Sequence, residues 1–130
     1  MSEYRPIEVD DNGFVVYENE DGDRKYKSLN GKEKHGFLGK WANMREYYLK
    51  ENRIEYWLEL CMSGELEEYL KELNERANEM KRDTVDAILS KDPIPQDAEF
   101  MEVLQRREAA DRQADEIVRY YLIYDEFAYI

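Results

Sequence analysis

The feature that most constrains the fold is a segment, residues 64–90, in which apolar and acidic side chains both recur at helical spacing. On a helical projection, its apolar positions fall within an arc of about 100°. Seven carboxylates occupy an arc of about 80° roughly opposite, in steps of 3, 4, 3, 4, 4 and 3 residues. The segment therefore predicts a long helix that packs on one side only. The acidic residues are Glu65, Glu68, Glu72, Glu75, Glu79, Asp83 and Asp86.

Helical periodicity also marks the segments before and after this one. Residues 38–62 change phase near Asn52, which predicts either a kink or two short helices. Ser63 then suits the N-cap of the long helix. The run Asp92–Pro95 ends that helix, because its two prolines cannot continue one. The next helix is expected to begin after an N-cap at Asp97 and to reach about Tyr124.

The apolar faces of these helices supply the predicted core. Five aromatic residues lie on them: Trp41, Tyr48, Trp57, Tyr69 and Tyr121. The last helix adds an apolar side that includes Phe100 and Leu104, and Cys61 is interpreted as a small core residue. Four tyrosines fit a single core face less well and are candidates for an interface: Tyr47, Tyr56, Tyr120 and Tyr129. The tail 127–130 either packs or frays.

Residues 1–36 carry strand and turn signals instead. The runs Ile7–Val9 and Phe14–Tyr17 are separated by Asp11-Asn12-Gly13, and Arg24–Leu29 can form another arm. We expect a mainly α fold, a three- to four-helix bundle with a small N-terminal β-hairpin or meander. Residues 1–36 would be this ribbon or a partly ordered arm, and residues 37–130 the helical domain. Because a small ribbon is marginal alone, the two should fold as a single unit.

Charge is distributed unevenly along the 130 residues, which suffice for one domain. The net charge is −12, from 19 basic and 31 acidic residues. Residues 24–53 nevertheless carry nine bases and three acids, a charge of +6 between flanks of −7 and −11. No 18-residue apolar run exists to span a membrane. The acidic N-terminus does not resemble a signal peptide, so a cytoplasmic location is expected.

Catalytic and metal-binding motifs are missing from the sequence. His35 is the sole histidine and lies in a Gly-rich loop, where solvent exposure is expected. One cysteine supplies neither a disulfide nor a Cys-based zinc site. There is no P-loop, GxGxxG, HExxH or EF-hand loop. We therefore expect a protein that is not an enzyme, with no cofactor and no metal.

Several short segments between residues 37 and 124 carry a family resemblance: Gly39-Lys40-Trp41, Met44-Arg45, Tyr48–Arg53, Leu60–Leu66, Tyr69-Leu70, Ala77, Ala114–Val118 and Leu122–Tyr124. Over this span the chain resembles the TnpV-like transposon-encoded proteins. The chain departs from the family at Ile54, where a proline is common. The resemblance implies an accessory protein of a bacterial mobile element, and it supplies no catalytic residues.

Three functional hypotheses follow. In the first, the seven carboxylates bind a basic, nucleic-acid-handling host protein, such as a CRISPR effector, and inhibit it as an anti-CRISPR protein or nucleic-acid mimic would. In the second, the protein is a DNA-binding accessory factor of transposition. In the third, it is a structural helical homodimer without another partner. The plain alternative is that the carboxylates only form a solvated face. The basic residues of the second hypothesis are Lys25, Lys27, Lys32, Lys34, Lys40, Arg45, Lys50 and Arg53.

Overall fold

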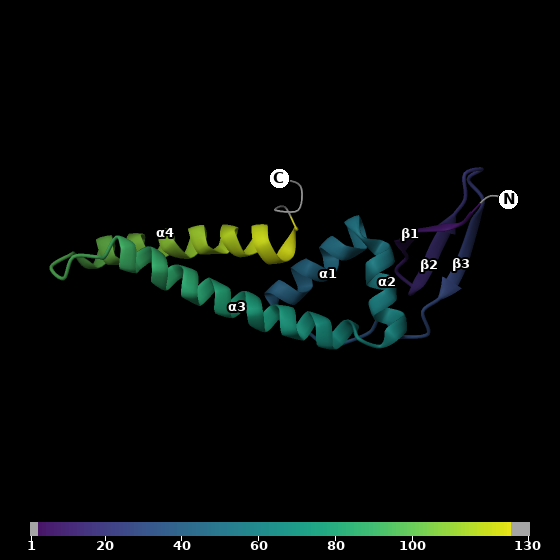
Figure 1. The fold of residues 1–130 in the computed structure, drawn as a ribbon, viewed down its shortest axis with the longest axis horizontal. Helices are drawn as coiled ribbons and strands as arrows, with labels where there is room; N and C mark the ends of the chain where they lie inside the picture. The colour runs from purple at the N-terminus through teal and green to yellow at the C-terminus, as the bar shows by residue number, and fades with distance from the viewer. Residues whose placement is uncertain (1–2, 126–130) are drawn as a thin grey trace. The chain divides into compact units, whose positions relative to one another are not determined.

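The computed structural model describes residues 3–125 and is mainly helical, with a small antiparallel sheet at the N-terminal end (Figure 1). This confirms the predicted secondary-structure class. The residues divide into two compact units, one up to Glu72 and the other from Leu73 onward. Tyr129 and the tail 127–130 lie outside the described residues, so the expectations for them stay predictions.

The N-terminal sheet is a three-stranded meander. Its strands are β1 (Arg5–Val9), β2 (Phe14–Glu18) and β3 (Arg24–Ser28), and β2 pairs antiparallel with both neighbours (Figure 1). In the first turn, the Asp10 carboxylate accepts two backbone N–H groups at 2.9 and 3.0 Å. Gly13 has a φ of 81°, which glycine adopts without a steric penalty. Local turn chemistry therefore produced the meander that the sequence predicts.

Two short helices follow, α1 (Lys40–Asn52) and α2 (Ile54–Ser63). Arg53 separates them with a φ of −143° and a ψ of 54°, outside the helical region. The predicted change of phase near residue 52 is thus a break between two helices. Side chains from the sheet and from the helices share one core, which consists of Val15, Leu29, Ala42, Leu49, Trp57, Leu58, Leu60, Cys61, Leu66 and Leu70.

Glycine, rather than serine, governs the junction between α2 and the long helix. Gly64 adopts the left-handed conformation (φ 77°), and its N–H donates to the Cys61 carbonyl. The Glu65 N–H donates to the Leu60 carbonyl, which completes the paired bonds of a Schellman C-cap. The Ser63 hydroxyl also donates to Leu60, at 3.2 Å. The predicted N-cap role of Ser63 is therefore wrong, because that residue belongs to the end of α2.

The long helix α3 (Leu66–Lys91) starts in the first unit and supplies much of the second. There, α4 (Phe100–Val118) runs back antiparallel to it and continues as a π-helix, η1 (Arg119–Ile123) (Figure 1). The Lys81 ammonium joins α3 to α4, at 3.1 Å from Asp111 and 3.0 Å from Asp115. The buried side chains of this unit are mostly small: Leu73, Ala77, Ala110, Ala114, Val118 and Ile123.

Two predictions for the C-terminal helix are wrong. The Ala98 N–H donates to the Pro95 carbonyl, so Asp97 lies inside a turn, and α4 begins later, after Glu99. Its buried stripe is also narrower than the apolar periodicity suggested. Phe100 is 77% exposed, and Leu104 and Tyr121 are exposed as well, because only the stripe through Ala110, Ala114 and Val118 is covered.

Candidate functional site: the acidic side of helix α3

All seven carboxylate residues of the predicted stripe are exposed, and we call them the acidic side of α3. Six lie on α3 itself. Glu65 precedes it, and its carbonyl accepts the Tyr69 N–H at 2.9 Å, in the first turn of the helix. The apolar residues of the same helix, from Leu66 to Ile88, are buried or half-buried, except that Ala87 is exposed. The structure therefore confirms that α3 has one packed side and one acidic, solvent-facing side.

In the part of the chain that the structure describes, the acidic side forms no ion pairs with lysine or arginine. Within residues 3–125, none of its seven carboxylates lies within 4 Å of a lysine or arginine nitrogen. Lys81, on the same helix, instead contacts Asp111 and Asp115 on α4. Burial alone would lower the pKa of Lys81, but its bonds to these carboxylates outweigh that effect and raise it. Lys81 therefore pairs with carboxylates of α4 and with none of the acidic side.

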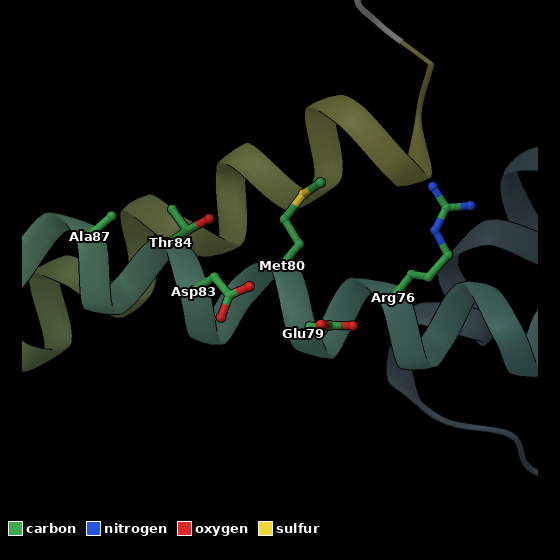
Figure 2. A pocket seen from close by; sticks show the side chains of 6 residues that line it. All are labelled: Arg76, Glu79, Met80, Asp83, Thr84 and Ala87. Atoms are coloured by element: carbon green, nitrogen blue, oxygen red, sulfur yellow. The ribbon is translucent and has the colours of Figure 1, made fainter.

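A shallow groove of about 430 Å³ runs along α3 where its acidic side meets its apolar side (Figure 2). Met80, Thr84 and Ala87 lie in line along one side of the helix, and Arg76 extends at one end (Figure 2). The carboxylates of Glu79 and Asp83 border the groove. Apolar and acidic groups therefore meet at one surface feature, which the helical projection alone did not reveal.

The basic residues of segment 24–53 differ in how far they are exposed to solvent. Six of the eight candidates are exposed, Lys50 is half-buried, and Arg45 is only 5% exposed. The Arg45 Nε donates to the Tyr69 hydroxyl at 3.0 Å, which holds this guanidinium inside the first unit. Three lysines lie over aromatic rings: Lys25 over Tyr4, Lys40 over Trp41 and Lys50 over Trp57, at 4.1, 4.4 and 5.0 Å.

Glu46, Trp57 and His35 form a buried polar cluster that no motif in the sequence predicted. The Glu46 carboxylate, in a residue that is 8% exposed, accepts a hydrogen bond from the Trp57 indole at 3.1 Å. Its other oxygen lies 2.9 Å from the His35 Nε2. The expectation of a solvent-exposed His35 is wrong, since its side chain is 16% exposed. The available signal was spacing: Glu46 follows Ala42 by four residues and precedes Leu49 by three, both on the packed side of α1.

The predicted aromatic core is confirmed in part. Trp41 and Trp57 are buried, whereas Tyr48 and Tyr69 are half-buried. Tyr56 packs edge-on against Tyr69, with ring centroids 5.7 Å apart. Among the other tyrosines, Tyr47 and Tyr56 are exposed and Tyr120 is half-buried.

Cys61 is fully buried, as predicted, and burial raises the pKa of its thiol to about 12. A thiol in that state is a poor nucleophile. Across residues 3–125, no three histidine, cysteine or acidic side chains come together in a way that could hold a metal ion. Nor does that part of the chain contain a helix whose length and hydropathy would let it cross a membrane.

Comparison with known proteins identifies the family. The family model for the transposon-encoded protein TnpV matches residues 20–123, a span that includes β3 and every helix described above. No curated protein and no solved structure gives a significant match. The family match contains both the basic segment and the acidic side of α3. Because it covers most of the sequence, the chain belongs to the TnpV family of transposon-encoded proteins.

Proposed function

We propose that this TnpV-family protein is a non-enzymatic binding protein that docks on a basic, nucleic-acid-handling host protein through the acidic side of α3 and inhibits it. A CRISPR effector is one partner of this class, which would make the protein an anti-CRISPR factor acting in the bacterial cytoplasm. The observation that carries the proposal is the row of seven exposed carboxylates without a cation within 4 Å among the described residues.

The energetics of a helix explain why this row is informative. Glu68 and Glu72, Glu75 and Glu79, and Glu79 and Asp83 are like-charge pairs four residues apart. Each such pair destabilises a helix by a few tenths of a kcal/mol, whereas a Lys at either position would stabilise it. A basic partner removes this repulsion on binding. The arrangement is therefore unfavourable for the isolated helix and favourable for a complex.

The charge density of the row also fits a surface that normally binds nucleic acid. The two ends of the row, Glu65 and Asp86, are 21 positions apart, which corresponds to about 32 Å at a rise of about 1.5 Å per residue. It therefore carries one charge per roughly 5 Å, compared with one per about 3.4 Å along a single DNA strand. A groove of Lys and Arg residues that holds phosphates can accept such a row instead.

Charge neutralisation on one side of α3 tests the proposal. The tagged protein with Glu72, Glu75 and Glu79 changed to Gln is compared with the wild-type protein in a pull-down from nuclease-treated host lysate. The matched control changes three exposed residues to Gln, Glu99 just before α4 and Glu102 and Glu108 on it, which gives the same net charge of −9. The expected partner is a nucleic-acid-binding protein that the wild type and the control retain and the α3 variant loses.

The second readout is inhibition. The recovered partner should lose affinity for its nucleic acid when the wild-type protein is added, and added nucleic acid should release the protein. Equal retention by the two variants would contradict docking through α3. Simultaneous binding of protein and nucleic acid to the partner would contradict inhibition by competition.

A second candidate is the DNA-binding accessory role, which the exposure of β3 favours. Every residue of this strand is exposed, including Arg24, Lys25 and Lys27. A gel shift at low and moderate salt decides this alternative, because binding through phosphates weakens steeply with salt. A complex at low salt that Lys25→Ala with Lys27→Ala abolishes would support it. The absence of a shift with any DNA or RNA would exclude it.

A further inference from the structure

We infer that the groove beside the acidic side of α3 receives an apolar side chain from a basic amphipathic helix of the partner. This inference rests on the proposed function and names the segment that would be recognised. The groove and the rest of the acidic side would have different roles. The groove would select a partner segment with an apolar residue between cations, and the remaining carboxylates would contribute only electrostatic attraction.

The shape and lining of the groove support this assignment. Its volume of about 430 Å³ lies at the small end of the range for ligand sites, and it is open to solvent. Met80 and Thr84 are half-buried along it, and Ala87 is exposed at one end. A methionine side chain is flexible and polarisable and adapts to a variety of apolar groups. Such a surface accommodates one or two side chains of a helix rather than an enclosed small molecule.

Three charged residues line the groove: Arg76 lies at one end, and Glu79 and Asp83 border the rest, so acidic groups are in excess. Glu79 and Asp83 are four residues apart, so they lie about 6 Å apart along α3. Neither has a lysine or arginine nitrogen within 4 Å among residues 3–125. Two cations one helical turn apart on a partner helix would match this spacing. A nucleic acid would instead bring like charge to the border.

The test uses two fluorescent synthetic peptides of about 18 residues, a length at which a designed sequence can form a helix in water. Both carry Lys or Arg pairs at i,i+4, and they differ only in having Leu or Ser next to those pairs. Binding to the full chain is measured by fluorescence anisotropy at roughly 50 and 300 mM salt. The Leu peptide should bind about tenfold more tightly than the Ser peptide. The free energy gained by burying a leucine side chain is larger than the free energy that a tenfold increase in affinity requires.

Two alanine variants locate the peptide on the protein. Ala87→Lys places a cation in the groove, and Ala109→Lys makes the same change on the exposed surface of α4. We expect Ala87→Lys to weaken binding of the Leu peptide at least tenfold and Ala109→Lys to leave it within twofold. Circular dichroism verifies that both variants keep the helical content of the wild type.

The outcomes separate this inference from the proposed function. Equal, salt-sensitive binding of both peptides would overturn the groove inference and leave docking by charge intact. No binding of either peptide at low salt would overturn both. Sedimentation of the wild type as a dimer that Ala87→Lys dissociates would assign the groove to a second copy, and that result also overturns the inference.

Discussion

Replacing Glu46 by Gln should remove a pH-dependent part of the stability of the fold. His35 Nδ1 lies 2.7 Å from the Gly36 carbonyl oxygen, and its Nε2 lies 2.9 Å from a Glu46 carboxylate oxygen. Because both neighbours are acceptors, both ring nitrogens must carry protons to satisfy them. Burial alone would lower the pKa of His35, but the Gly36 carbonyl and the Glu46 carboxylate outweigh it and raise the pKa, with a smaller contribution from Glu67.

The sign and size of the effect follow from this geometry. Since the folded pKa of His35 lies above its ordinary value of about 6.5, the pair stabilises the fold fully below that pH. The stabilisation is lost as the pH rises through the folded pKa. A hydrogen bond to a charged group contributes about 1.5–3 kcal/mol. The amide introduced by Glu46→Gln can still accept from the Trp57 indole and can donate to neutral His35, so the variant should fold.

Urea unfolding, followed by tryptophan fluorescence, measures the effect at about pH 5.5 and pH 9. The free energy of unfolding of Glu46→Gln should fall below the wild-type value by about 1.5–3 kcal/mol at the lower pH, and the two should converge at the higher pH. His35 is the only histidine in the sequence, so its proton NMR titration reports its pKa directly. That pKa should drop in the variant.

The control is Glu67→Gln, which alters an exposed carboxylate that does not contact the imidazole and should change stability by less than about 0.5 kcal/mol. Parallel pH profiles for the wild type and Glu46→Gln, together with an unchanged His35 pKa, would refute the ion pair. A larger effect of Glu67→Gln than of Glu46→Gln would show that the raised pKa had been assigned to the wrong carboxylate.

Three further predictions concern local features. Gly64→Ala should lower the free energy of unfolding by about 1–2 kcal/mol, because an alanine is strained at φ 77°, whereas Gly36→Ala should leave that free energy unchanged. Urea titration compares the two variants, and an equal loss of unfolding free energy in both would contradict the backbone argument. Cys61 should react with a thiol reagent only as fast as the protein unfolds, and rapid labelling of the native state would disprove its burial. Lys81→Met should lower the free energy of unfolding by about 1.5–3 kcal/mol, because Asp115, with a side chain 13% exposed, loses a charged hydrogen-bond donor. Thermal unfolding measures this effect, and an unchanged melting temperature would contradict it.

Much of the candidate site was predictable because it depends on spacing along a single helix. The exposure of Glu72 and Glu79 and the burial of Leu70 and Ala77 follow from the helical period alone. The groove was not predictable, because it depends on how far Met80 and its neighbours extend and on how much of α3 the rest of its unit covers. Periodicity gives the direction of a side chain and does not give the depth to which it is buried.

The sequence by itself determined the local elements. The turn at Gly13 and the end of α3 before Pro93 arise from backbone preferences that act within a few residues. The break between α1 and α2 at Arg53 coincides with a change of phase in the apolar pattern. The sequence also determined which residues form the acidic side of α3, because the helical period fixes the side of a helix on which each residue lies.

Only the tertiary structure decided which partners satisfy the buried polar groups. Glu46 meets His35 and Trp57, each eleven residues away along the chain, and Arg45 meets Tyr69 twenty-four residues away. Burial of a charged group is tolerated only where such partners converge on it. Convergence depends on how distant segments pack, and no rule of spacing within one element contains that information.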